Sequence, residues 1–249
     1  MFKSVLKIVI FGLLVAFMVI SLAFSSGHLS KVNCDELLVI IPDGSPRFLN
    51  EEEIIKLIKK ADAKLFEKKL NAINTEQLER ELKKEAAIKN IEVFRRVVGD
   101  SMDFKGKLLV EVKQRNPILR IINDKEDFYL DKEGVRIPAS REFTAKVLVV
   151  NGHLDEKFAR EELLPLVAFI DEDEFWKAQI EQLQIKTNGE IIIAPLVGDQ
   201  LIEFGDAKDF RKKLRNLKAL YEQAFPKTGW DCYSRINLKY SNQVVCTKK

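Results

Sequence analysis

The chain begins with an unusually long apolar stretch, in which almost every residue from Val5 to Phe24 is hydrophobic. About twenty helical residues at 1.5 Å each reach ~30 Å, the thickness of the hydrocarbon core of a bilayer. Lys3 and Lys7 lie at its start, whereas the residues that follow it immediately are Ser25, Ser26, Gly27 and His28. The positive-inside bias therefore predicts a cytoplasmic tail at 1–7, a transmembrane anchor at 8–25 and an exported remainder.

A cleaved signal peptide is the alternative for this stretch, because Ala23-Phe24-Ser25 resembles a cleavage site. The uninterrupted apolar run is longer than the core of a typical signal peptide, which favours the anchor. Residues 26–36 are more polar and are expected to form a linker.

The next eighty residues, 37–116, alternate between strand and helix patterns. Asn50 and Asn74 each precede acidic or amide residues and then apolar residues at helical spacing, which is typical of helix starts. Apolar runs and period-two alternation predict the strands. The expected elements are a strand at 37–41, helices starting near 51 and 75, with the second ending near 87, and strands at 91–98 and 106–115, in the order β-α-α-β-β.

From Pro117 the pattern changes to short strands with compact turns, and we expect a second domain at 117–249. Asn188-Gly189 between two apolar runs is a strong hairpin signal, and the turn at Gly198-Asp199 extends the hairpin to a three-stranded meander. The expected elements are strands at 118–122, 128–130, 135–137, 147–150, 183–187, 190–194 and 201–204, and helices at 156–170, 174–183 and 206–224.

The last residues predict a hairpin of two strands, Arg235–Tyr240 and Gln243–Thr247, around Ser241-Asn242. With a two-residue loop, Cys246 faces Asn237. Ile236, Leu238, Tyr240 and Val245 then share one face, and Asn237, Lys239, Val244 and Cys246 share the other. No residue after Lys249 covers the outer strand, so we expect an open edge to which another chain can add a strand, unless an earlier segment of the same chain pairs there.

Composition narrows the possible partners. The net charge of +3 is too small to indicate a nucleic-acid surface, and the basic face of the helix at 206–224 is more typical of a solvated surface than of a lipid contact.

The acidic trio Asp171–Asp173 is interpreted as a helix start and not as a calcium loop, because no calcium-loop spacing follows it.

Three cysteines in an exported domain raise the possibility of a Cys232–Cys246 disulfide. The expected hairpin register separates these residues by ~16 Å along the strand, and a disulfide tolerates about 7 Å between Cα atoms. Unless the chain reverses near Asp231, we expect three free or buried thiols.

Catalytic and metal-binding motifs are not evident. Neither His28 nor His153 lies at metal-ligand spacing from cysteine or carboxylate residues, and no nucleophile, phosphate-binding or zinc motif occurs. We therefore predict no catalytic, cofactor-binding or metal residue, no cofactor and no small-molecule substrate. A hydrolase with paired carboxylates, for example Asp103 or Glu190, remains an alternative.

Several segments together resemble the bitopic cell-division family FtsQ/DivIB, in the form found in Bacteroidetes-type bacteria. The resemblance spans the chain from the anchor to the end. These segments are 112–117, 128–131 with Gly134, 149–152, 188–190, Gly205-Asp206 with Lys213, Leu214 and Leu217, 229–230, 236–240 and 242–246.

The resemblance implies an α+β protein with a single transmembrane helix, a membrane-proximal POTRA domain and a distal β domain with helices and a mixed or antiparallel sheet. It implies a non-enzymatic divisome scaffold in the inner membrane, largely periplasmic, at the division septum. FtsB-like and FtsL-like proteins are the implied partners, with indirect influence on the septal peptidoglycan synthase. The implied partner-binding residues are Ile236, Leu238, Lys239, Tyr240, Gln243, Val244, Val245 and Cys246.

This sequence departs from the family in a short cytoplasmic tail and in lacking the carboxyl-terminal extension of some branches. A POTRA-bearing secretion component is a further alternative, although about 130 residues with several helices are too few for its many-stranded barrel.

Overall fold

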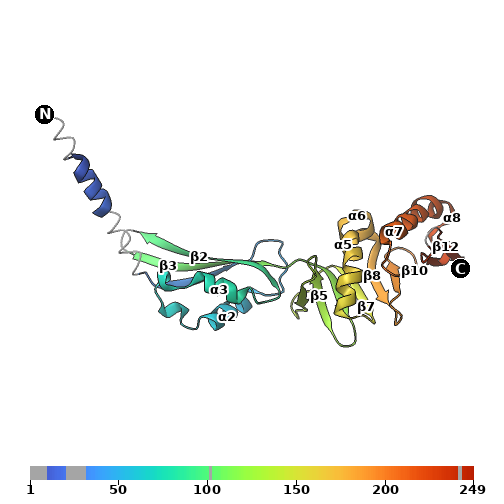
Figure 1. The fold of residues 1–249 in the computed structure, drawn as a ribbon, viewed down its shortest axis with the longest axis horizontal. Helices are drawn as coiled ribbons and strands as arrows, with labels where there is room; N and C mark the ends of the chain where they lie inside the picture. Colours follow the sequence, from blue (N-terminus) through green and yellow to red (C-terminus); the bar gives the residue numbers. More distant parts are fainter. Residues whose placement is uncertain (1–9, 21–31, 101–102, 241–242) are drawn as a thin grey trace. The chain divides into compact units, whose positions relative to one another are not determined.

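The computed structural model describes residues 10–20, 32–100, 103–240 and 243–249 (Figure 1). The chain divides into two compact units, Met1–Gln114 and Arg115–Lys249. Residues 10–20 are helical, and their large apolar side chains are exposed, Phe11 and Phe17 by 70% and 72%. The predicted anchor at 8–25 lies partly outside the described residues, and none of the helices within them is both long and apolar enough to span a bilayer.

The first unit has the predicted β-α-α-β-β order. Asn50 closes a capping box with Glu53 at the start of the first helix, and the Asn74 side chain accepts from the amide of Gln77 at the start of the second. The elements are β1 (Cys34–Ile40), α2 (Glu51–Ala61), the 3-10 turns η1 (Leu65–Glu67) and η2 (Leu70–Ala72), α3 (Thr75–Leu82), β2 (Ile88–Asp100) and β3 (Asp103–Gln114).

The sheet of this unit has the order β1-β3-β2, with β1 parallel and β2 antiparallel to β3. Alternate strand residues such as Val93, Leu108 and Val110 pack with Ile54 and Ile58 of α2 in one core. Two expectations differ from the structure: α3 ends at Leu82, not near Ala87, and the strands of the β2–β3 hairpin extend into the expected loop at 99–105. Strand pairing therefore extends as far as Asp100 and Asp103.

The second unit is built on a mixed sheet of nine strands in the order β12-β11-β10-β9-β8-β7-β4-β5-β6. The strands are β4 (Pro117–Ile122), β5 (Asp127–Asp131), β6 (Arg136–Pro138), β7 (Leu148–Gly152), β8 (Ile180–Ile185), β9 (Ile191–Pro195), β10 (Leu201–Gly205), β11 (Tyr233–Asn237) and β12 (Val245–Lys248). Strands β4, β7 and β8 are mutually parallel, and β8, β9 and β10 form the predicted meander.

Helices connect β7 to β8 and β10 to β11. They are α4 (Glu156–Phe158), η3 (Ala159–Leu163), α5 (Leu164–Glu172) and α6 (Glu174–Gln179), then α7 (Phe210–Ala219), η4 (Leu220–Ala224), α8 (Phe225–Thr228) and the turn η5 (Trp230–Cys232). Apolar side chains from these helices and from one face of the sheet form a single core, which includes Leu163, Leu183, Phe204, Leu217 and Ile236. The larger helices lie beside the sheet in Figure 1, and residues of its opposite face, such as Arg120 and Gln184, are absent from that core.

The helix expected at 174–183 is wrong in its second half. It ends at Gln179, and Ile180–Ile185 form strand β8 between β7 and β9. The spacing of three residues between Ile180 and Leu183 favours a helix, but a register irregularity between Ile180 and Gln182 lets both face the core from strand β8, which pairs with two neighbouring strands.

Candidate partner-binding edge

Strand β12 is the outermost strand of the nine-stranded sheet. Its neighbour β11 is paired on both sides, in parallel with β10 and antiparallel with β12. Within the described part of the chain, β12 pairs with β11 alone. Of the two terminal strands, β12 is therefore the one that presents an edge.

The observed register of the terminal hairpin differs from the expected one, in which Cys246 lies opposite Asn237. Cys246 lies opposite Ile236, and Val245 lies opposite Asn237, so the pairing is shifted by one residue. Residues 238–244 connect the strands, which is longer than a two-residue loop, and the expected turn at Ser241-Asn242 lies outside the described residues. Because side chains alternate along a strand, a shift of one residue exchanges the faces.

The predicted partner-binding residues are consequently distributed differently over the two faces. Ile236 and Leu238 are 0% and 2% exposed and belong to the core, and Val244 and Cys246 pack against the same core. Val245 is 43% exposed on the opposite face. The expectation that Val245 shares a face with Ile236, and that Val244 and Cys246 share one with Asn237, is wrong. The remaining predicted residues, Lys239, Tyr240 and Gln243, are exposed.

Two hydrogen bonds show which main-chain amides and carbonyls of β12 point towards β11 and which point away from it. The amide of Leu238 donates to the Glu203 carbonyl at 2.9 Å, so Leu238 and Ile236 direct their main-chain groups towards β10. The main-chain amide and carbonyl of Asn237 then point towards β12, and those of its partner Val245 point towards β11. The amide of Lys249 likewise donates to the Cys232 carbonyl, at 3.2 Å. Main-chain groups alternate in direction along a strand. The amide and carbonyl of Cys246, which lies between the inward-directed Val245 and Lys249, therefore point away from β11 at the open edge of the sheet.

Two ion pairs fix the segment that leads to β12. Arg235 Nη1 lies 3.0 Å from Glu203 Oε1, and Asn237 Nδ2 donates to Glu203 Oε2 at 3.1 Å. Lys239 Nζ donates to Glu190 Oε1 at 2.6 Å. This contact raises the pKa of Lys239 and lowers that of Glu190, in each case chiefly through the hydrogen bond between them.

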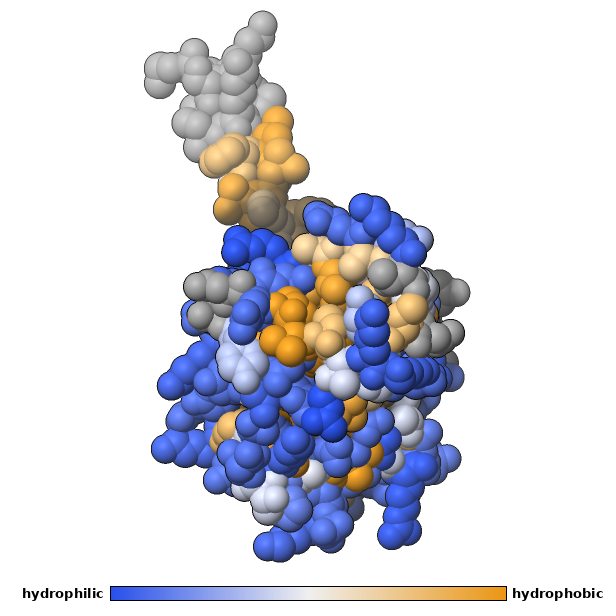
Figure 2. All heavy atoms as spheres, turned by 90° about the vertical axis from the view of Figure 1, so that its right-hand side faces the viewer, coloured by the Kyte–Doolittle hydropathy of each residue, from blue (hydrophilic) through white to orange (hydrophobic). Residues whose placement is uncertain are grey.

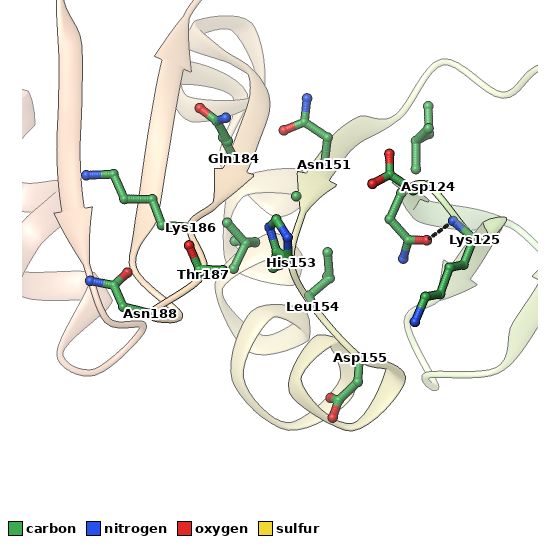
Figure 3. A pocket seen from close by; sticks show the side chains of 14 residues that line it. Asp124, Lys125, Asn151, His153, Leu154, Asp155, Gln184, Lys186, Thr187 and Asn188 are labelled. Carbon is green, nitrogen blue, oxygen red and sulfur yellow. Dashed lines mark hydrogen bonds between the residues drawn. The ribbon is translucent and has the colours of Figure 1, made fainter.

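A separate hollow lies at the carboxyl ends of the parallel strands β4, β7 and β8 (Figure 3). Two tight hairpins flank it, one carrying Asp124 and Lys125 and the other Lys186, Thr187 and Asn188, while the exposed His153 lies between them. Cations and carboxylates are interspersed, so the hollow favours neither an anion nor a cation. Within residues 10–20, 32–100, 103–240 and 243–249, no group of three His, Cys, Asp or Glu side chains is placed to hold a metal ion.

Cys34, Cys232 and Cys246 are not joined in disulfides, and Cys34 is buried whereas Cys232 is exposed. Cys246 lies opposite Ile236, and the main chain of Cys232 is bonded at Lys249, so the two cysteines are several residues apart along the ribbon. Partial burial raises the pKa of the Cys246 thiol. A thiol with a raised pKa carries less of the reactive thiolate, which fits a packing role.

Residues 116–247 match the model of the family described as FtsQ/DivIB, C-terminal related. The chain belongs to this family. Residues 32–100 match a POTRA-like domain, which agrees with the β-α-α-β-β order of the first unit. No curated protein is similar enough to the chain to count as a match.

Membership of the FtsQ/DivIB-related family makes this a cell-division protein, and the proteins of the FtsQ/DivIB family are non-enzymatic scaffolds. Segments that carried the resemblance are distant in sequence but meet at the edge. Glu190, from the 188–190 segment, accepts a hydrogen bond from Lys239, from the 236–240 segment. The chemistry of the site is thus main-chain hydrogen bonding on a strand held by side-chain contacts.

Sequence reasoning missed Glu203, which is 7% exposed and binds β11 with both carboxylate oxygens. The available signal was the alternation of Arg235, Asn237 and Lys239, three polar residues on one face of a strand that predicts acidic or amide partners on its neighbours.

The surface around the edge is partly apolar. Figure 2 views the side of the molecule on which β12 and α8 are drawn at the right of Figure 1, and it shows an apolar area among hydrophilic side chains. The apolar residues of β12 itself are Val245 and the half-buried Cys246. In the adjoining turn, Trp230 is 36% exposed and packs edge-on against Phe225 at 4.8 Å between ring centroids.

Proposed function

We propose that this FtsQ/DivIB-related protein is a divisome scaffold that binds FtsB-like and FtsL-like proteins and thereby helps to control septal peptidoglycan synthesis. The observation that supports this is the outermost position of β12, with the amide and carbonyl of Cys246 directed away from β11. An extended segment of a partner would add a tenth strand there, with main-chain bonds for affinity and side-chain contacts for specificity.

The proposed location is the inner membrane at the division septum, with the two folded units in the periplasm. The basis is the apolar sequence at 8–25 preceded by Lys3 and Lys7, together with the family. The proposed role requires neither catalysis nor a cofactor, since strand addition makes only non-covalent bonds.

Strand addition at β12 can be tested by removing one main-chain amide that points away from β11. Cys246→Pro removes the amide that faces the partner, and Pro is tolerated on the open side of an edge strand. Cys246→Ala is the matched control, because it also removes the thiol but keeps the amide. The measurement is binding of full-length protein in nanodiscs to the purified periplasmic segment of the FtsB-like protein from the same organism, by biolayer interferometry.

We expect Cys246→Pro to weaken binding at least tenfold and Cys246→Ala to bind within about twofold of wild type, since a lost hydrogen bond and an obstructed strand contact together exceed about 1.4 kcal/mol. Unfolding curves of both variants show whether the β domain is still folded. Equal binding by the proline variant, with the domain folded, overturns strand addition at β12.

A further inference from the structure

The attachment of the terminal hairpin to the rest of the sheet is short. Strands β10 and β11 pair in parallel over three residue pairs, Leu201 with Arg235, Ile202 with Ile236 and Glu203 with Asn237. Parallel pairing is slightly less stable per residue than antiparallel pairing. Few main-chain bonds therefore define where β11, and with it β12, lies along β10.

The side chains at this junction add a specific restraint. Glu203 lies on the sheet face without helices, with its side chain only 10% exposed, and its two oxygens are bound by two residues of β11, Arg235 and Asn237. A carboxylate removed from water is costly unless its oxygens are satisfied, so both contacts are needed in the native register.

A displaced register would break these contacts in a defined way. A slip of one residue would turn Arg235 and Asn237 to the core face and expose Ile236. A slip of two residues would preserve the faces and bring either Arg235 or Lys239 opposite Glu203. In the second case Lys239 would have to leave Glu190, which it contacts at 2.6 Å. The observed register lets Glu203 keep both Arg235 and Asn237 while Lys239 keeps its contact with Glu190.

We propose that Glu203 is a positioning residue for partner capture, which sets the register of β11 and so selects the main-chain groups and side chains that β12 presents to a partner strand. This role rests on the proposed function for its biological meaning, but the effect on register does not depend on a partner. Glu190 acts through Lys239 as the second restraint.

The experiment measures amide hydrogen exchange in the full-length protein, without a partner. In Glu203→Ala we expect the amide of Leu238, which is bonded to the Glu203 main chain, to exchange at least tenfold faster than in wild type, together with the inward amides of Val245 and Thr247. Glu203→Gln keeps an acceptor for Asn237 and should restore part of the protection.

Asp127→Ala is the matched control. Asp127 lies on the same sheet face and forms two bonds with Arg120, at 2.9 and 2.7 Å, but it belongs to β5 at the other end of the sheet. It should leave the Leu238 amide unchanged. A uniform rise in exchange over Val150 in β7 and over β11 alike would indicate general destabilisation and would overturn the positioning role, as would unchanged protection of Leu238 in Glu203→Ala.

Partner binding supplies the second readout. Glu203→Ala should reduce binding of the FtsB-like periplasmic segment at least fivefold, whereas Asp127→Ala should not. If wild-type binding proves independent of the Cys246 amide, the docking proposal fails, while the exchange result still decides whether Glu203 sets the register.

Discussion

The side-chain amide of Gln114 pairs with the main chain of Leu49 through two hydrogen bonds. The amide of Leu49 donates to Gln114 Oε1 at 2.9 Å, and Gln114 Nε2 donates to the Leu49 carbonyl at 2.7 Å. Gln114 is 1% exposed, so water cannot replace either bond. The pair ties the end of β3 to the loop before α2, whose N-cap is the next residue, Asn50.

Gln114→Ala should therefore destabilise the POTRA domain. It removes the partners of both the amide and the carbonyl of the half-buried Leu49, and each lost hydrogen bond costs about 1 kcal/mol. Urea unfolding of the full-length protein, followed by exchange of β2 and β3 amides, measures the loss. Lys113→Ala, at an exposed neighbouring position, should change stability by less than about 0.5 kcal/mol. Equal effects of the two substitutions would contradict the role of the Gln114–Leu49 pair.

The corrected register of the terminal hairpin can be tested with a charge on either face. Cys246→Asp places a carboxylate against the core and should destabilise the β domain by more than about 1 kcal/mol. Val245→Asp places the same group at an exposed position and should be tolerated. Thermal unfolding compares the variants. The opposite ranking would support the register in which Cys246 faces Asn237.

Gly152 is required where β7 approaches β8. Its φ is +107°, and a Cβ atom there would lie 2.1 Å from the Ile185 carbonyl oxygen. Gly44 has a similar φ of +77° but open space around it. Gly44→Ala should cost about 1 kcal/mol from backbone strain, and Gly152→Ala at least about 2 kcal/mol more because the main chain must move. Urea midpoints of the two variants measure the difference, and equal costs would exclude the steric effect.

Acid should weaken the contact between Glu190 and Lys239. The pKa of Glu190 in the folded protein lies below its ordinary value of 4.5, chiefly because of the hydrogen bond from Lys239. The contribution to stability is therefore complete above pH 4.5 and is lost as the pH falls through the lowered pKa. The stability difference between wild type and Glu190→Gln, from urea unfolding, should be larger at pH 7 than at pH 3. A difference independent of pH would show that the carboxylate charge contributes nothing.

The order of the POTRA elements could be predicted because local signals and tertiary packing agree. Asn50 and Asn74 mark the helix starts, and apolar positions such as Ile54 and Leu108 do lie in the core. Strand β8 could not be placed from Ile180 and Leu183 alone, because their strand conformation depends on neighbours from distant parts of the chain.

The candidate edge was predicted in outline and not in register. An open strand near the end followed from the pattern at 235–247, but the pairing of Cys246 depends on a connection longer than the two residues that the turn residues indicated. The contact of Glu203 with Arg235 and Asn237 joins residues more than thirty positions apart, so a local pattern gives only the polar alternation of β11 and not its partner.

The far end of the same sheet has the opposite character. Strand β6 contains three residues and includes Pro138, which has no amide hydrogen to offer a neighbouring strand. A short strand that ends in proline offers few main-chain groups to a neighbour, so β6 is a poor surface for joining to β12 of another copy. The two ends of the sheet therefore differ in their ability to pair, which disfavours head-to-tail chains of copies joined through their sheets.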